Sequence, residues 1–220
     1  MPLAPTSTTT LAKEIERRTR ALPTRDAASL RALRCEVSRE IRDRGARDVL
    51  ALAQALLAGP TERFIAYELV QKHPEAAAAL GQRELERLGK GMSSWVEVDC
   101  FAVYLAGPSW RNGQVGDSLI RRWTRSKDRW WRRAALVSTV PLNMRSRGGA
   151  GDASRTLAVC RLLLDDRDDM VVKALSWALR ELAKRDPASV RRFLAQHESQ
   201  LAPRVLREVR NKLRTGLKSG

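Results

Sequence analysis

Apolar residues recur at three- and four-residue spacing along nearly the whole chain after Leu11, as they do in amphipathic α-helices. Two clear stripes are Leu30, Leu33, Val37, Ile41 and Val49, Leu52, Leu56, Leu57. Strong helix formers fill the positions between them. No run of alternating β-branched residues bounded by hairpin turns interrupts the pattern. We therefore expect an all-α fold.

Glycine and proline punctuate this pattern. Gly59-Pro60 should end the helix that carries the second stripe. Thr61 then resembles an N-cap for a helix over residues 62–72, which should end before Pro74. The glycine-rich segment over residues 144–152 lacks the Gly-Lys-Ser/Thr ending of a phosphate-binding loop. We expect it to be a flexible connection between two repeats.

Three of the expected helices resemble one another. Each carries an alanine near its middle, at Ala66, Ala134 and Ala174, and is followed by a proline. Their separations fit one or two periods of about 35–40 residues, which is typical of two-helix solenoid repeats. We expect a curved α-solenoid that forms a single domain over residues 11–215, between a disordered tail at 1–10 and a frayed end at 216–220.

The charge balance points to a polyanionic partner. The chain carries 41 Lys and Arg against 25 Asp and Glu, a formal net charge of +16. Arginine supplies most of the excess, and its planar fork matches phosphate geometry. Nucleic acid is the leading partner, and an acidic membrane surface is the second. A GC-rich genome would explain a preference for arginine over lysine, but not the shortage of acids.

The spacing of cysteines and histidines and the length of the apolar runs do not favour a metal site, a disulfide or a membrane-spanning helix. Cys35, Cys100 and Cys160 are isolated, and the two histidines lie far from any cysteine. No apolar run approaches the ~18 residues needed to span a bilayer, and residues 1–10 lack the features of a signal peptide. We expect no cofactor, no bound metal, no membrane contact, and a monomer with three buried free thiols in the reducing cytoplasm, associated with the bacterial nucleoid when bound to DNA.

Six tryptophans are many for this length, and they differ in setting. Trp123 follows Leu119 and Ile120 in an apolar stripe, so it should be a core residue. Trp95 instead shares a helix face with Asp99, four residues later. Taken alone, a core tryptophan and a salt-bridged or solvated aspartate would explain this pair more simply than catalysis does.

Two further clusters combine tryptophan with cations. Trp177 has Lys173 four residues before it and Arg180 three residues after it, which places both cations on neighbouring rows of one helix. Arg132 and Arg133 follow Trp130 and Trp131, a pattern suited to stacking and phosphate contact. A solvated basic edge is the alternative for these two arginines.

Three sequence motifs, in the order in which they occur along the chain, resemble those of one protein family. They are Ser94-Trp95-x-x-x-Asp99, Trp130-x-x-Arg133-Ala134-Ala135, and Lys173-Ala174-x-x-Trp177-x-Leu179-Arg180-Glu181-x-Ala183-Lys184-x-x-Pro187. Together they resemble the AlkD family of bacterial DNA alkylation repair glycosylases, which are HEAT-like repeat proteins. The likeness covers roughly residues 61–214 and is strongest over the third motif. Each motif is weak alone, but three at compatible distances are fairly specific.

The resemblance implies a site and an activity. The family's two lesion-facing tryptophans correspond to Trp95 and Trp177, its catalytic aspartate to Asp99, and its phosphate-contacting arginine to Arg133. Further DNA contacts would come from Trp130, Arg132, Lys173 and Arg180. The implied activity is hydrolysis of the N-glycosidic bond of cationic N3- or N7-alkylpurines in double-stranded DNA, with the lesion left stacked and bulky adducts allowed (EC 3.2.2.-).

The chain also departs from the family pattern. Where the family has a second tryptophan beside the position of Trp95, this chain has Val96 or Ser94. The segment over residues 11–22 lacks the aromatic residue of the family's N-terminal helix. The loop over 144–152 is longer than usual. These differences affect the N-terminal contribution and the lesion range, and leave the central residues in place.

The chemistry explains why these residue types belong together. Glycosidic cleavage develops positive charge on the sugar, which a fixed carboxylate such as Asp99 stabilises while it positions water. The indole faces of Trp95 and Trp177 would flank the sugar, and Arg133 would keep Asp99 ionised. No lysine lies on the Trp95–Asp99 face, so a monofunctional enzyme is favoured over a lyase. The alternatives are a non-catalytic module for branched or damaged DNA and a solenoid that binds an acidic protein.

Overall fold

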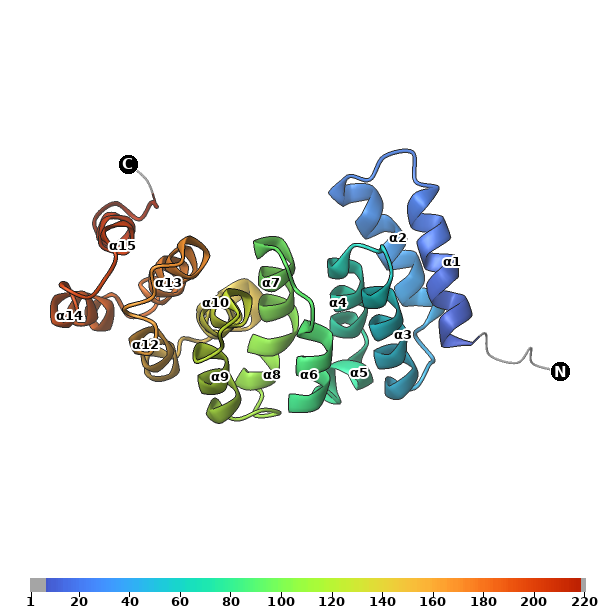
Figure 1. Ribbon diagram of the computed structural model, residues 1–220, viewed down its shortest axis with the longest axis horizontal. Coiled ribbons are helices and arrows are strands. Elements are labelled where there is room, and N and C mark those ends of the chain that lie inside the picture. The colour runs from blue at the N-terminus through green and yellow to red at the C-terminus, as the bar shows by residue number, and fades with distance from the viewer. Residues whose placement is uncertain (1–6, 219–220) are drawn as a thin grey trace. The chain divides into compact units, whose positions relative to one another are not determined.

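The computed structural model describes residues 7–218, and every regular element in them is helical (Figure 1). This confirms the predicted all-α class of helical repeats. The chain divides into two compact units, one within residues 1–90 and the other within 91–220. The prediction of one domain over 11–215 stays a prediction. The two units are described separately below.

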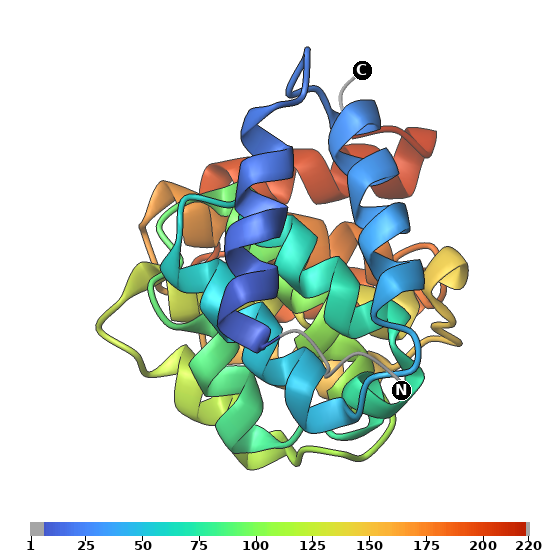
Figure 2. The same cartoon turned by 90° about the vertical axis from the view of Figure 1, so that its right-hand side faces the viewer.

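Unit 1 contains the first six helices. In Figure 2, α1 and α2 lie side by side at the front, and they also pack against each other along the chain. α3 contacts α1 and α4, and α2 contacts α4, so each helix buries one face. The helices are α1 (Thr8–Arg20), α2 (Ala27–Glu40), α3 (Ala46–Ala58), α4 (Arg63–Lys72), α5 (Pro74–Ala78) and α6 (Gln82–Gly89).

The predicted apolar stripes form the core of this unit. All four members of the first stripe are buried, and so are Val49, Leu52 and Leu56 of the second. Leu57 is partly exposed, because it lies at the edge of the buried face of α3. The first helix begins at Thr8 rather than at Leu11, since the side chain of Ser7 accepts a hydrogen bond from the backbone N–H of Thr10. Residues 1–6 of the predicted tail lie outside the described residues.

The predicted N-cap at Thr61 is wrong. α4 begins at Arg63, and Glu62 is its N-cap without a side-chain cap bond. The hydroxyl of Thr61 is buried and makes no hydrogen bond to another described residue. The turn after Gly59-Pro60 directs this side chain into the protein, away from the helix end that it was expected to cap. The predicted end of the helix before Pro74 is confirmed.

Unit 2 contains the remaining helices in two layers. Figure 1 shows α7, α10, α13 and α15 as successive neighbours, while α9, α12 and α14 form the second layer. α10 packs between α7 and α13, and α13 packs against α15. The elements are α7 (Trp95–Phe101), a π-helical turn (Ala102–Ala106), α8 (Gly107–Arg111), α9 (Asp117–Thr124), α10 (Arg129–Val137), α11 (Val140–Asn143), a 3₁₀ turn (Arg145–Arg147), α12 (Ala153–Arg161), α13 (Asp169–Leu182), α14 (Pro187–Gln196) and α15 (Pro203–Thr215).

The first layer repeats at the expected interval. Its helices α7, α10 and α13 have the N-caps Ser94, Asp128 and Asp168, which are 34 and 40 residues apart. Each cap accepts a hydrogen bond from a backbone N–H of the first turn of its helix. Because the caps match, the first and fifth residues of each helix lie on comparable faces, and the ninth residue of α13, Trp177, continues the same face. This register places the candidate site.

α7 is anchored firmly on its inner side. Phe101 is fully buried and contacts the rings of Trp123 and Trp131 at 5.9 Å each. The helix then continues through the π-helical turn into α8, and Gly107 makes this passage possible. A Cβ at that position would lie 2.4 Å from a side-chain atom of Pro141 and 2.6 Å from the carbonyl oxygen of Ser138. The face of α7 opposite this anchor carries the candidate site.

The loop over residues 144–151 is more ordered than the expected flexible connection. Arg185 donates hydrogen bonds to the carbonyl oxygens of Asn143 (2.8 Å) and Gly149 (2.8 Å). Arg111 donates to the carbonyls of Pro141 and Arg147. Charged hydrogen bonds to backbone carbonyls at both ends fix the path of the loop. A glycine-rich composition alone does not reveal such distant partners.

Candidate active site

The start of α7 presents Trp95 to solvent. Ser94 caps the helix by accepting a hydrogen bond from the N–H of Glu97, and the Glu97 carboxylate accepts one from the N–H of Ser93 (2.8 Å). Trp95 is therefore the first residue of the helix, and its side chain is 56% exposed. Val96 beside it is 45% exposed. Two adjacent exposed apolar side chains are typical of a binding surface.

Asp99 lies one turn beyond Trp95 and forms a bidentate ion pair with Arg133 of α10. The Nε of Arg133 donates to one carboxylate oxygen at 2.9 Å, and Nη2 donates to the other at 2.8 Å. The side chains are 16% exposed for Asp99 and 6% for Arg133. The two residues that the sequence motifs paired are thus in direct contact. A small part of the Asp99 side chain remains exposed to solvent.

The third nitrogen of Arg133 links this pair to α13. Its Nη1 donates to the backbone carbonyl of Met170 at 2.6 Å, so all three guanidinium nitrogens are engaged within the protein. α7, α10 and α13 are thereby joined through a single side chain. In this arrangement Arg133 holds the carboxylate in place, and the burial of its side chain leaves little access to its two remaining N–H donors.

The protonation of Asp99 reflects two opposing effects. Burial raises the pKa of this carboxyl because the charged form loses hydration. The hydrogen bonds and the positive charge of Arg133 lower the pKa, but burial outweighs them and the pKa lies above its ordinary value. Arg133 therefore favours the ionised form, as expected, without fully offsetting the cost of desolvation.

Lys173 and Trp177 lie on one face of α13, one turn apart. Trp177 is partly exposed, and it is seven residues from Met170, whose carbonyl binds Arg133. Two helical turns separate those positions along one face. The Lys173 ammonium pairs with Asp169 at 2.7 Å and is 42% exposed. The site roles of Lys173 and Trp177 stay predictions.

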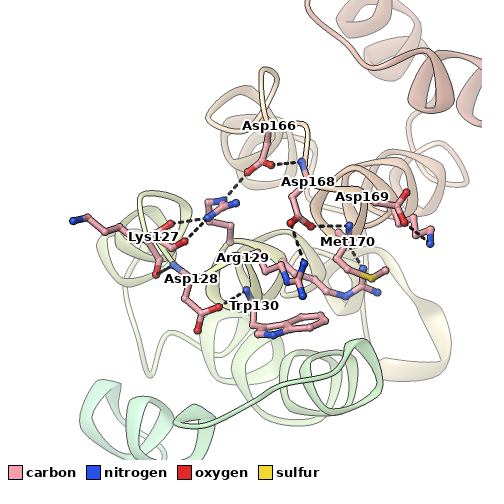
Figure 3. Close-up of polar contacts among 12 residues, drawn as sticks. Lys127, Asp128, Arg129, Trp130, Asp166, Asp168, Asp169 and Met170 are labelled. Atoms are coloured by element: carbon pink, nitrogen blue, oxygen red, sulfur yellow. Dashed lines mark hydrogen bonds and ion pairs between the residues drawn. The ribbon is translucent and has the colours of Figure 1, made fainter.

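The start of α10 carries the other predicted DNA contacts (Figure 3). Trp130 is partly exposed, and the guanidinium of Arg129 lies 4.9 Å from its ring centroid. Arg132 is held inside the fold, because it donates to Asp166 at 2.6 Å and to two loop carbonyls at 2.9 and 3.0 Å. Its neighbour Arg129 is therefore the more accessible cation at this helix start.

Arg180 faces the next helix of the layer. Its Nε donates to the hydroxyl of Ser176 at 3.2 Å, and it pairs with Glu208 of α15 at 3.8 Å. Burial lowers the pKa of this guanidinium, and only 17% of the side chain is exposed. The contacts of Arg180 thus stabilise the packing of α13 on α15. Its role as a DNA contact stays a prediction.

Three features of this site were not anticipated. They are the carbonyl of Met170 as a partner of Arg133, the capping pair Ser94 and Glu97, and the contacts of Arg129. The Ser-x-x-Glu spacing before an apolar run is a recognised helix start and could have located the beginning of α7. No residue pattern marks a backbone carbonyl as a ligand, so Met170 carried no such signal.

Neither a metal site nor a membrane span is evident over residues 7–218. No group of three or more His, Cys, Asp or Glu side chains in this range is arranged to hold a metal ion. None of the helices there combines the length and the apolar composition needed to cross a bilayer. The prediction of three buried thiols is wrong for Cys35, which is exposed, and Cys100 is partly exposed, so only Cys160 is buried.

Comparison with known proteins gives one clear match. A family model described as DNA alkylation repair enzyme matches residues 26–213 of the chain. That range includes the ion pair of Asp99 and Arg133 and both candidate tryptophans. A search of curated proteins returned no match.

Proposed function

The chain belongs to the DNA alkylation repair enzyme family, and from this premise we propose that it is a monofunctional DNA glycosylase. Its substrates would be N3- or N7-alkylated purines in duplex DNA. The observation that carries the proposal is the Asp99 carboxylate, which is fixed by two hydrogen bonds, partly open to solvent, and one turn from an exposed indole. In a strongly basic DNA repair protein, a carboxylate at this place repels phosphate, so it adds no affinity for DNA and is suited to a chemical role.

The proposed reaction is hydrolysis at the sugar carbon C1′. The bond from C1′ to the alkylated purine breaks, and its electron pair leaves with the cationic base, which becomes neutral. Water adds to C1′ and loses a proton, first to Asp99 and then to solvent. Each carboxylate oxygen has two lone pairs, and Arg133 occupies one on each. One remaining lone pair on each oxygen is available to the sugar and the water.

The indoles would grip the sugar rather than enclose a base. Trp95 stands at the surface of α7 with more than half of its side chain exposed, which suits contact with a sugar at the face of a duplex. Its ring face would stabilise positive charge on the sugar, as would that of Trp177. A base that stays stacked could carry a bulky adduct without needing a pocket of matching size.

A monofunctional reaction fits the state of the lysine that shares a face with Trp177. A Schiff base requires a neutral amine, whereas Lys173 is ion-paired with Asp169 at 2.7 Å. Water is therefore the proposed nucleophile. The expected products are a free alkylpurine and an abasic site with an intact backbone.

One observation favours a second candidate, a non-catalytic module that binds damaged or branched DNA. Both oxygens of Asp99 already bind Arg133, which reduces the negative charge that the carboxylate offers a sugar cation. This candidate predicts DNA binding without base release.

Base release from methylated duplex DNA separates the two candidates. We expect the wild-type protein to liberate 7-methylguanine and leave alkali-sensitive sites, and Asp99→Asn to lose this activity while it still binds DNA. The variant Asp165→Asn removes the same charge from an exposed residue of unit 2 and should release base at the wild-type rate. Absence of release by folded wild-type protein would reject the glycosylase.

A further inference from the structure

The exposure and the hydrogen bonds of each arginine at the candidate site indicate which guanidinium is available to contact DNA. Arg133 has the expected position, but its three nitrogens are bound to Asp99 and Met170, and its side chain is 6% exposed. Two of its five N–H donors remain, one on each terminal nitrogen, but the burial of the side chain restricts their access to a phosphate. The phosphate contact therefore needs another donor nearby.

Arg129 meets this need. It precedes Arg133 by one turn of α10, so it lies on the same helix face. Its side chain is 51% exposed, and its one ion pair within residues 7–218 is a single contact of 3.4 Å with Asp168. Four of the five N–H donors of its guanidinium are then left for a ligand.

Two neighbours hold the Arg129 side chain at the helix start (Figure 3). The ring of Trp130 lies under the guanidinium at 4.9 Å, which fixes the plane of the fork. One oxygen of Asp168 accepts from Arg129, and the other caps α13 through the N–H of Met170 (2.9 Å). The weak ion pair orients Arg129 and uses only one of its five N–H donors.

We propose that Arg129, rather than Arg133, binds the backbone phosphate beside the lesion, and that Asp168 holds Arg129 until DNA displaces this carboxylate. Arg133 is then a positioning residue for Asp99. The inference rests on the proposed function, because it assigns the DNA contact of the same site. Trp95 and Arg129, each one turn before a member of the ion pair, would contact the sugar and the phosphate respectively.

The salt dependence of DNA binding tests this assignment without any base release. Anisotropy of a labelled unmodified duplex, measured from 50 to 200 mM salt, gives the slope of log K against log salt. Loss of one phosphate contact changes this slope by about 0.9, so the fourfold rise in salt should weaken Arg129→Ala about 3.5-fold less than the wild type. The control Arg125→Ala removes an exposed arginine that makes no ion pair in the described part of the chain, and should keep the wild-type slope.

A second pair of variants tests the role of Asp168. Asp168→Asn keeps the cap of α13, since asparagine caps as well as aspartate, but frees Arg129. It should bind the duplex more tightly than Asp165→Asn, which removes an equal charge three residues away. Circular dichroism checks that each variant is folded.

The outcomes are distinct. A wild-type slope in Arg129→Ala, a slope that falls in Arg133→Met instead, or equal tightening by both aspartate variants would overturn the assignment. If the slope changes as expected but the wild type releases no base, the proposed glycosylase fails while the phosphate contact stands.

Discussion

The ion pair between Asp99 and Arg133 should be a major source of stability in unit 2. The perturbation is Arg133→Met, which keeps an apolar stem of similar length but removes the guanidinium. It leaves the Asp99 carboxylate, 16% exposed, without its charge partner and the Met170 carbonyl without its donor. Breaking a buried ion pair from one side costs about 3–5 kcal/mol. Because Asp99 keeps some contact with water, we expect a value near the lower end, about 3 kcal/mol.

Tryptophan fluorescence is the appropriate assay, since all six tryptophans lie in unit 2. Urea unfolding followed by this signal reports on the unit that contains the pair. In thermal unfolding, about 3 kcal/mol corresponds to a Tm lowered by about 6–12 °C for a chain of this size. Arg129→Met is the matched control on the same helix. Its side chain is half exposed and its ion pair is long, so it should cost less than about 1 kcal/mol.

A double-mutant cycle isolates the interaction itself. Asp99→Asn should cost about 2 kcal/mol, because it leaves a buried guanidinium with one neutral acceptor in place of a carboxylate. The double variant should be more stable than the sum of the single effects predicts, by about 2 kcal/mol. A cost below about 1 kcal/mol for Arg133→Met, or additive effects in the cycle, would refute the reasoning that this pair is buried and coupled.

Three further expectations follow from the described residues. Base release should fall on acidification with a midpoint above the ordinary aspartate value of about 3.9, because burial raises the pKa of Asp99 and the reaction uses its ionised form. Arg133→Met removes the influence that lowers this pKa, so it should move the midpoint to higher pH. A pH–rate profile that is flat down to pH 4 would contradict this expectation. Cys35 is exposed, whereas Cys160 is fully buried and its pKa is raised by burial, so a thiol reagent should label Cys35 in the fastest phase of the reaction. The variant Cys35→Ser should lack that phase. Rapid labelling of Cys160 in the native protein would contradict this expectation. Base release should be unchanged by EDTA, since no metal-ligand cluster occurs within residues 7–218, and loss of release that is restored by added metal would show otherwise.

The parts of the fold that follow from local chemistry were predictable from the sequence. The apolar stripes of α2 and α3 have the helical period, and burial of that face is what stabilises such helices. The absence of strands in residues 7–218 follows from the same pattern. Helix starts were less predictable, as Thr61 illustrates, because a cap depends on the backbone angle before the helix as well as on residue type.

The candidate site required information that no single segment contains. Spacing alone placed Trp95 and Asp99 on one helix face, but the pairing of Asp99 with Arg133, 34 residues away, came from the family resemblance. Exposure also depends on tertiary packing. Arg132 and Arg133 look alike in sequence, yet one is tied to a loop and the other to the site, while Arg129 remains half exposed.

The most direct test of the central claim is the single-turnover rate of 7-methylguanine release from a duplex, with enzyme in excess, for the wild type and Asp99→Asn. A carboxylate about 4 Å from a sugar cation contributes about 4 kcal/mol at an effective dielectric constant near 20. Its loss should therefore slow release on the order of 10³-fold, while affinity for the unmodified duplex is retained or increased. A variant that releases 7-methylguanine at close to the wild-type rate would contradict the assignment of Asp99 as the catalytic carboxylate.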